Sequence, residues 1–343
     1  MNTRRVFVVV GVALLLAAFV TVGSFAGGAA ERDEVPDVIR VGYAPSDWDP
    51  ADFHGLYGVG IEERLAELLG EDGYEFTIRA AGSHSDHEEQ LSIVEAFVAD
   101  GYDFIALTPT DYEAQQMTYR YLHEVGVPFI VGNYRDPFPE EWGIEQPVGF
   151  SGYSHEDAGV AVAEWVRDNY DPDDTKVVFM YGTSGYTSYA RLQEDLFNEY
   201  GFEIAYKAYA DFQRAQAFDQ MERIMAAHPD TDLVLTASSV MATGAVEAAD
   251  ANGWLDQVDI TGAGGTIEEL LDIERGRLKM AWARDNVAMG RATGERIYQW
   301  FHGDRDDIEF VFDSPIHIIE SVEDINRHIN PVIYEVEGLE FPR

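Results

Sequence analysis

Three polar residues follow segments that read as the ends of parallel strands. Asn133 comes two residues after the apolar run Phe129–Val131, and Arg284 directly follows Met280–Ala283. Arg191 lies just beyond a glycine-rich turn, near the start of a predicted helix. A guanidinium offers up to five N–H donors in a fixed plane, which suits a hydroxylated or anionic ligand. The alternatives are surface salt bridges for the arginines and a loop cap for Asn133.

Aromatic residues near the same predicted loops would supply a flat apolar face for a sugar ring. Phe53 and Phe212 are the two candidates. Combined with donors at strand ends, such faces favour binding of a small polar ligand over bond-breaking chemistry.

Motifs for catalysis are weak throughout the chain. The sequence has no phosphate-binding loop of the P-loop type, no zinc-protease helix motif and no nucleophile elbow. Gly262–Gly265 lacks the third spaced glycine of a dinucleotide-binding turn, so we interpret it as a tight turn between strand and helix. We therefore expect no catalytic residues and no cofactor.

The segment His84–His87 has residue types that could hold a metal ion. On a polar loop before a helix, Asp86 or Ser85 is more typical of an N-cap, which accepts a hydrogen bond from the first helical amides. We therefore expect a helix cap here and no metal site.

The net charge is −40, from 63 acidic and 23 basic residues. Phosphate binding needs a basic face, so nucleic acid is excluded as a partner. Only three of the cations are lysines, Lys176, Lys207 and Lys279. This composition favours a surface adapted to strong salt, where screening removes self-repulsion, over an ordinary acidic protein. Cysteine is absent, which excludes disulfides, thiolate metal sites and an acylated cysteine anchor.

The N-terminus has the order of an export signal. Arg4 and Arg5 precede an apolar run from Val6 to Val22, and small residues follow up to Ala30. We expect a signal over residues 1–30 and a linker over 31–37, with an uncleaved anchor as the alternative. The mature protein should lie in the periplasm or outside the cell.

From Val38 onward, short apolar runs alternate with longer amphipathic ones. Four strand–helix steps fit between Val38 and Val131, which predicts a parallel, doubly wound sheet. The pattern restarts after residue 150, which predicts a second lobe of the same kind. We place the first lobe at 38–150 plus 285–308 and the second at 151–284 plus 309–343, joined by a three-segment hinge. Ligands of such sheets bind where strands end, so we expect the site between the lobes.

Residues 38–312 resemble the periplasmic sugar-binding proteins of the ribose-binding type, which have the type 1 periplasmic binding fold. The segments that carry the resemblance are Leu107–Asp111, Ala210–Phe212, Ala227–Asp230 and Gly244–Val246. The resemblance implies two lobes that close on a small sugar-like ligand and a monomer that acts with a membrane ABC permease.

Within that family the chain is most similar to receptors of the LuxP type, which bind the furanosyl borate signal autoinducer-2. Ser184–Arg191, Gly262–Gly265 and Ala283–Asn286 carry this likeness. It implies that Asn133, Arg191 and Arg284 contact the ligand, with a sensor kinase as the partner.

Several positions depart from that receptor pattern. Its stacking tryptophan is Ala263 here, its Thr-Asp pair is Ser239-Val240, and its first-loop residues become Asp49 and His54, with Trp48 nearby. A pentose, hexose or related polyol carried by an importer is therefore our leading hypothesis, and the quorum-signal receptor is the alternative. A hydrolase using Asp49 or His54 lacks a recognisable catalytic arrangement, and a repressor lacks a helix-turn-helix.

Overall fold

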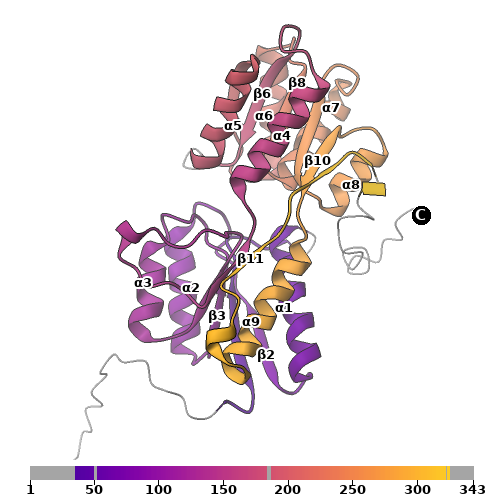
Figure 1. The fold of residues 1–343 in the computed structure, drawn as a ribbon. Helices are drawn as coiled ribbons and strands as arrows, with labels where there is room; N and C mark the ends of the chain where they lie inside the picture. The colour runs from indigo at the N-terminus through magenta and orange to yellow at the C-terminus, as the bar shows by residue number, and fades with distance from the viewer. Residues whose placement is uncertain (1–34, 50–51, 184–186, 322, 325–343) are drawn as a thin grey trace, which may run out of the picture.

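The computed structural model describes residues 35–49, 52–183, 187–321 and 323–324, with side chains from residue 192 onward in the helix that begins at Thr187. The chain forms two α/β lobes, one above the other in Figure 1. The expected export signal and linker fall almost wholly outside these ranges. No helix in the described ranges is long and apolar enough to cross a membrane.

The first lobe is a six-stranded sheet in the order β11-β5-β4-β3-β1-β2, with every neighbouring pair parallel. Its strands are β1 (Ile39–Ala44), β2 (Tyr74–Ile78), β3 (Phe104–Leu107), β4 (Phe129–Gly132), β5 (Gly149–Gly152) and β11 (Val311–Asp313). Its helices are α1 (Phe53–Leu69), α2 (His87–Ala99), α3 (Gln116–Val125) and α9 (Asn286–His302), with a short 3-10 turn at Glu140–Trp142. The inner strands β3 and β4 are wholly buried and apolar, as a sheet covered on both faces requires.

The second lobe repeats this plan with the order β12-β10-β9-β8-β6-β7. Its strands are β6 (Lys176–Tyr181), β7 (Glu203–Tyr209), β8 (Leu233–Thr236), β9 (Asp259–Gly264), β10 (Met280–Ala283) and β12 (His317–Ile319). Its helices are α4 (His155–Asn169), α5 (Thr187–Tyr200), α6 (Arg214–Ala227), α7 (Ser239–Asn252) and α8 (Ile267–Glu274). Only β12 runs antiparallel to its neighbour among these strands. The two parallel-sheet lobes confirm the predicted fold class.

Three segments cross between the lobes, which Figure 1 shows at the waist of the molecule. They follow β5, β10 and β11, since each of those strands ends in one sheet or lobe and the next element belongs to the other. The third crossing differs from the sequence expectation near residue 309. Because β11 pairs with β5 through Asp313, the chain leaves the first lobe only after that residue.

The helix α1 begins earlier than the sequence pattern suggested. The helical spacing of apolar residues from Ile61 to Leu69 predicts a helix from Gly60, whereas α1 starts at Phe53 and includes Gly55 and Gly58. Because glycine is a poor helix former, the sequence pattern does not indicate the first two turns of α1. The glycines serve packing instead: a Cβ on Gly60 would lie 2.2 Å from the backbone oxygen of Val287 in α9. This close contact of α1 with α9 places the start of α1 at the hinge.

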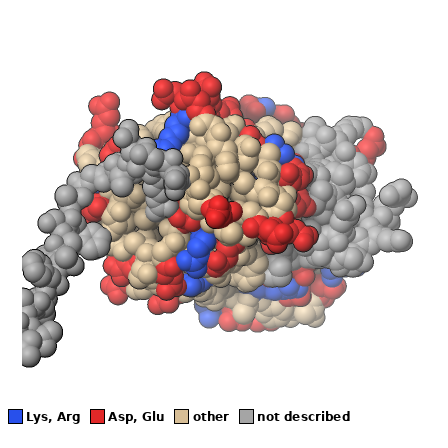
Figure 2. Space-filling view, turned by 90° about the horizontal axis from the view of Figure 1, so that it is seen from below, with Lys and Arg blue, Asp and Glu red and all other residues tan. Residues whose placement is uncertain are grey.

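Acidic residues outnumber basic residues in the chain, 63 against 23, and many of them lie at the outer surface. On the face shown in Figure 2, Asp and Glu are spread across the view with few Lys or Arg between them. Many of the cations are paired, for example Arg64 with Glu295 and Arg291 with Glu67. The excess of acid is therefore solvated at the surface.

Candidate functional site

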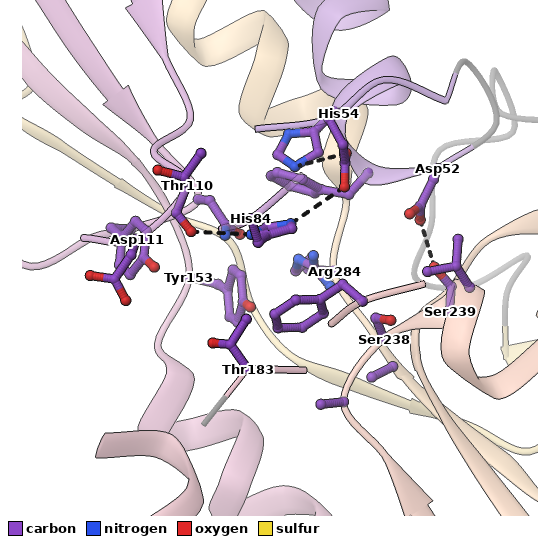
Figure 3. Close-up of a pocket in the computed structure, with 18 of the residues that line it drawn as sticks. Asp52, His54, His84, Thr110, Asp111, Tyr153, Thr183, Ser238, Ser239 and Arg284 are labelled. Carbon is purple, nitrogen blue, oxygen red and sulfur yellow. Dashed lines mark hydrogen bonds and ion pairs between the residues drawn. The ribbon is translucent and has the colours of Figure 1, made fainter. Parts of the chain in front are cut away.

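A cleft between the lobes lies where the strands of both sheets end (Figure 3). Its empty volume is ≈ 730 Å³ with the solvent-open mouth included. Because that figure counts open solvent, the enclosed part of the cleft is much smaller and suits only a small ligand.

Arg284 is the main cation of the cleft. It follows β10 at the second crossing and is only 7% exposed. Its guanidinium carbon lies 4.5 Å from the ring centre of Tyr153, 4.8 Å from that of Phe53 and 5.1 Å from that of Trp282. Aromatic faces attract a cation but accept no conventional hydrogen bond. Nε and Nη1 of Arg284 accordingly have no hydrogen-bond partner among the residues that the structure describes.

Asn133 supplies an acceptor to the same cleft. It has a left-handed backbone, with φ of 69°, a conformation in which asparagine is enriched. Its N–H donates to the carbonyl of Ser151, which fixes the turn after β4. Its side-chain oxygen Oδ1 is buried without a partner in the described part of the chain. The cleft thus offers unused donors from Arg284 and an unused acceptor from Asn133.

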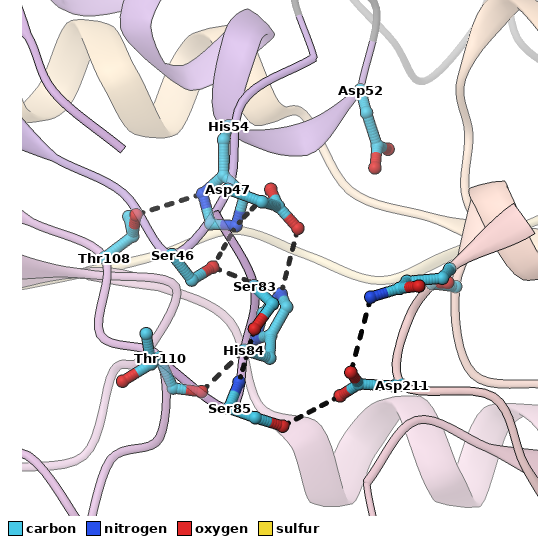
Figure 4. Close-up of polar contacts among 12 residues, drawn as sticks. Ser46, Asp47, Asp52, His54, Ser83, His84, Ser85, Thr108, Thr110 and Asp211 are labelled. Atoms are coloured by element: carbon cyan, nitrogen blue, oxygen red, sulfur yellow. Dashed lines mark hydrogen bonds and ion pairs between the residues drawn. The ribbon is translucent and has the colours of Figure 1, made fainter. Parts of the chain in front are cut away.

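The first-lobe wall holds a network of imidazole, hydroxyl and carboxylate groups (Figure 4). His54 Nε2 and His84 Nε2 lie 2.9 Å and 3.2 Å from the hydroxyl of Ser46. Asp47 lies 3.4 Å from His54 and 3.5 Å from His84. Thr108 Oγ1 contacts the other ring nitrogen of His54 at 3.0 Å. Burial lowers the pKa of His54 well below its usual value, with the charges of His84 and Arg284 adding to the effect.

The second-lobe wall is built from small residues around the turn after β9. The backbone N–H groups of Ala263, Gly265 and Thr266 all donate to the buried carboxylate of Glu269. Burial raises the pKa of Glu269 to about 7. The amides that would hold a dinucleotide phosphate are therefore occupied by the protein itself, which agrees with our interpretation of a plain turn.

Three pairs of residues join the walls across the cleft. Ser239 Oγ donates to Asp52 Oδ1 at 2.5 Å, and Ser85 Oγ donates to Asp211 Oδ1 at 3.0 Å. The rings of His84 and Phe212 lie 4.5 Å apart between centroids. Burial raises the pKa of Asp52, and the bond from Ser239 opposes that rise. These contacts stabilise an arrangement in which the lobes touch.

Most of the predicted ligand residues line this cleft. They are Phe53, His54, Asn133, Phe212, Ser239 and Arg284. Whether they bind a ligand stays a prediction. Arg191 lies in α5, and its side chain falls outside the described residues.

Trp48 and Asp49 lie elsewhere, because the chain turns outward after Asp47. Both are exposed, and neither lines the described cleft. The Trp48 ring instead lies over Gly58 of α1, where a Cβ would be 3.4 Å away. The acids that face the cleft from this loop are Asp47 and Asp52.

Sequence reasoning missed His84, Asp47, Tyr153 and Trp282 as cleft residues. The segment 84–87 was considered only as a unit, and the structure separates its two histidines. His84 joins the network with His54, whereas His87 Nδ1 contacts Thr110 Oγ1 at 2.8 Å. Asp86 occupies the N-cap position of α2, but its carboxylate accepts from Ser83 rather than from the helix amides.

Comparison with known families gives one match over most of the chain. A family model described as a periplasmic binding protein domain matches residues 42–303. Among curated proteins, the ribose import binding protein of Bacillus subtilis is 25% identical over 223 residues, 64% of this chain and 70% of the relative. A putative rhizopine-binding protein of Rhizobium meliloti is 26% identical over 247 residues, 70% of this chain and 78% of the relative.

Solved structures share the architecture. A solute-binding protein of an ABC transporter from Bacillus halodurans, with bound myo-inositol, superposes with a TM-score of 0.69 at 21% identity, covering 86% of this chain and 98% of that one. The myo-inositol binding protein of Caulobacter superposes with a TM-score of 0.71 at 20% identity, covering 88% and 97%. The type 1 periplasmic binding fold is thereby confirmed.

Proposed function

The chain belongs to the periplasmic binding protein domain family, and from that premise we propose that it is an extracytoplasmic solute-binding protein. It captures a small sugar or sugar-like polyol between its lobes and presents it to an ABC importer. Its curated relatives include binding proteins for ribose import, and similar structures hold myo-inositol. Those relatives are transport proteins rather than enzymes, and we propose the same of this chain.

One observation carries the proposal. Arg284 and Asn133 line the cleft, and each has buried polar atoms that have no partner among the described residues. A buried polar group without a hydrogen bond costs about 1–3 kcal/mol, so such groups persist where a ligand or water completes them. A polyol can satisfy both at once, because each hydroxyl both donates and accepts.

The chemistry of the walls favours a neutral ligand over an anion. Among the residues that the structure describes, Asp47, Asp52 and Asp111 line the cleft, against the guanidinium of Arg284. A carboxylate or phosphate ligand would be repelled by these acids, whereas hydroxyl groups can donate to them. The rings of Phe53, Tyr153 and Trp282 around Arg284 give an apolar face for the C–H side of a sugar or cyclitol ring.

Binding works by closure of the two lobes. A ligand that touches both walls stabilises the closed state by its differential affinity for that state. The closed surface is then what a membrane permease recognises. We propose a monomer exported to the periplasm or cell exterior, with the signal at residues 1–30 either removed or kept as an anchor.

The hypothesis of an autoinducer-2 receptor acting through a sensor kinase is less favoured. The curated relatives named above serve import or solute binding. In the described cleft, the small residue Ala263 stands at the position of that receptor's stacking tryptophan. The borate signal still belongs in any ligand panel, because Arg191, Arg284 and Asn133 match that receptor's pattern.

Titration calorimetry against pentoses, hexoses, inositols and the borate signal tests the proposal. We expect at least one neutral polyol to bind with a 1:1 stoichiometry, and native mass spectrometry of the purified protein to show the same mass added. Binding of an anionic sugar acid in preference to every neutral polyol would contradict the proposal.

A further inference from the structure

The first-lobe wall places two imidazoles and one carboxylate around a common point. One ligand atom from each of Asp47, His54 and His84 can be chosen so that all three lie within 4.8 Å of one another. We propose that these residues bind a divalent transition-metal ion, with zinc as the best match, in the wall of the cleft. The site itself does not depend on the identity of the transported solute.

The spacing of the donor atoms fits a tetrahedral ion. His54 Nε2 lies 3.4 Å from Asp47 Oδ1, and His84 Nε2 lies 3.5 Å from Asp47 Oδ2. Zinc bonds of about 2.0–2.2 Å to nitrogen and oxygen give tetrahedral edges of roughly 3.3–3.6 Å. Each imidazole nitrogen therefore lies about one edge length from an oxygen of Asp47, Oδ1 for His54 and Oδ2 for His84, so a modest turn of the carboxylate would bring one oxygen to an ion shared by all three residues.

The contact at Nδ1 of His84 also supports a metal ion at Nε2 of the same ring. Its Nδ1 lies 3.3 Å from the backbone carbonyl of Thr110, which can only accept. Nδ1 therefore carries the proton, and in the neutral ring Nε2 presents a lone pair toward the carboxylate of Asp47. Two electron-rich groups that face each other need either a proton or a metal ion between them.

The neighbouring hydroxyl cannot supply a proton to both rings. Ser46 Oγ lies within hydrogen-bond distance of both Nε2 atoms but has a single proton. It can therefore donate a hydrogen bond to at most one of the two imidazoles. A metal ion completes both, together with Asp47.

His54 has the outer partner that a ligating histidine usually has. Its Nδ1 lies 3.0 Å from Thr108 Oγ1, whose residue is anchored by Gln90 through its backbone carbonyl. Such a partner holds the ring in the orientation that turns Nε2 toward Asp47. Both imidazoles thus turn Nε2 toward Asp47 and keep Nδ1 in the protein.

The ion would have an open side toward the ligand. Asp47, His54 and His84 all line the cleft, whereas Ser46 is fully buried and does not line it. Three protein ligands with one position open is the arrangement of a zinc site that takes an exogenous ligand. Under the proposed function, that position takes a hydroxyl oxygen of the polyol.

Zinc titration of the untagged protein after stripping with EDTA tests the site. The buffer holds molar NaCl and excess MgCl2, which screen and occupy the acidic surface. We expect one zinc ion per chain, and His84→Gln should weaken zinc binding by roughly 100-fold or more, since even outer partners account for about 10–100-fold. Thr108→Val should give an intermediate loss. His87→Gln is the matched control, because His87 lies three residues further on, at the start of α2, and contacts Thr110 without joining the cluster.

His84 is partly exposed on a loop, so its variant should fold, and circular dichroism checks this. The variant Asp47→Asn should give a second, independent loss of zinc affinity. The absence of any site resistant to magnesium, or equal losses in His84→Gln and His87→Gln, would overturn the proposal. Cobalt in place of zinc should give the intense visible absorption of a tetrahedral site, and a weak octahedral spectrum would also overturn it.

Titration with myo-inositol and ribose, with and without zinc, separates this proposal from the proposed function. Tighter polyol binding with zinc supports the open coordination position, and unchanged binding overturns that part alone. Zinc binding in a protein that takes no polyol in either state would leave the metal site standing and contradict the function.

Discussion

The two walls of the cleft are built from different kinds of side chain. The first-lobe wall carries ionisable groups that already have partners, such as His54 with Thr108 and Ser46. The second-lobe wall carries small side chains around Ala263, and its Glu269 is turned inward onto the backbone. Between them Arg284 stands at the crossing with donors unused.

This contrast separates the groups that shape the cleft from the groups that contribute most of the binding energy. Groups that are already paired must exchange one partner for another when a ligand arrives, so their net gain is small. Groups that are buried and unpaired gain the most. We therefore expect the crossing residues to dominate affinity, the first wall to select the ligand, and the second wall to act through closure.

Replacing Arg284 should have the largest effect. Arg284→Met keeps the length and contacts of the side chain with the rings but removes every donor. A hydrogen bond to a charged group contributes about 1.5–3 kcal/mol, so affinity should fall roughly ten- to a hundred-fold. The melting temperature of the unliganded protein should not fall, because the variant also removes a buried cation with unsatisfied donors. Calorimetry and differential scanning calorimetry measure the two effects.

Arg223→Met is the matched control, since Arg223 is an exposed residue of α6 away from the cleft. An Arg284 variant that binds normally would break the comparison, because the affinity would then come from the walls. A large loss of stability would mean that Arg284 is a structural residue of the hinge.

The second-largest effect should be the contribution of the buried residue His155 to the pH dependence of stability. His155 lies between the rings of Tyr134 and Tyr153, and burial lowers its pKa to about 3, with Arg284 adding to the shift. In the unfolded chain its pKa is about 6.5, so only the unfolded state takes up a proton as the pH falls from there. Stability is therefore lost below that value, by at most about 1.4 kcal/mol per pH unit for this residue.

The variant His155→Phe isolates this contribution, because it keeps a ring between the two tyrosines. Its stability relative to the parent should rise as the pH falls from neutral toward acid, measured by urea unfolding at each pH. The difference between variant and parent matters, because Glu269 titrates in the same range with the opposite sign: its pKa is raised to about 7, so its burial costs less at lower pH. A pH-independent difference would contradict the assignment.

The sequence predicted the lobes well and the cleft in part. Apolar runs such as Phe104–Leu107 report burial directly, since a strand covered on both faces must be apolar. Arg284 and Asn133 were found because they follow such strands. Asp49 and Trp48, which the sequence also predicts as ligand residues, do not line the described cleft, because alternation does not tell which side of an irregular turn faces it. The cluster of His54 with His84 joins residues 30 positions apart, and no local pattern reports such a meeting.

Loss of the bond between Ser239 and Asp52 should have a moderate effect on closure. Ser239→Ala removes the donor of this bond between the walls and should shift the unliganded protein toward the open state by about 1 kcal/mol. Small-angle scattering should show a larger radius of gyration. Ser92→Ala is the control, because Ser92 donates within α2. No change in scattering would mean that the second wall does not act through closure.

The smallest effect on binding should come from salt, which acts on the outer surface rather than on either wall. The net charge of −40 repels itself most at low ionic strength, where the screening length grows to ~30 Å at 0.01 M. The melting temperature should therefore rise by several degrees from dilute buffer to molar NaCl or KCl. Affinity for a neutral polyol should stay nearly constant, because the cleft groups are buried and the ligand carries no charge. A melting temperature that does not rise with salt would contradict the salt adaptation. An affinity that falls steeply with salt would mean that the acidic or cationic groups of the cleft bind a charged ligand.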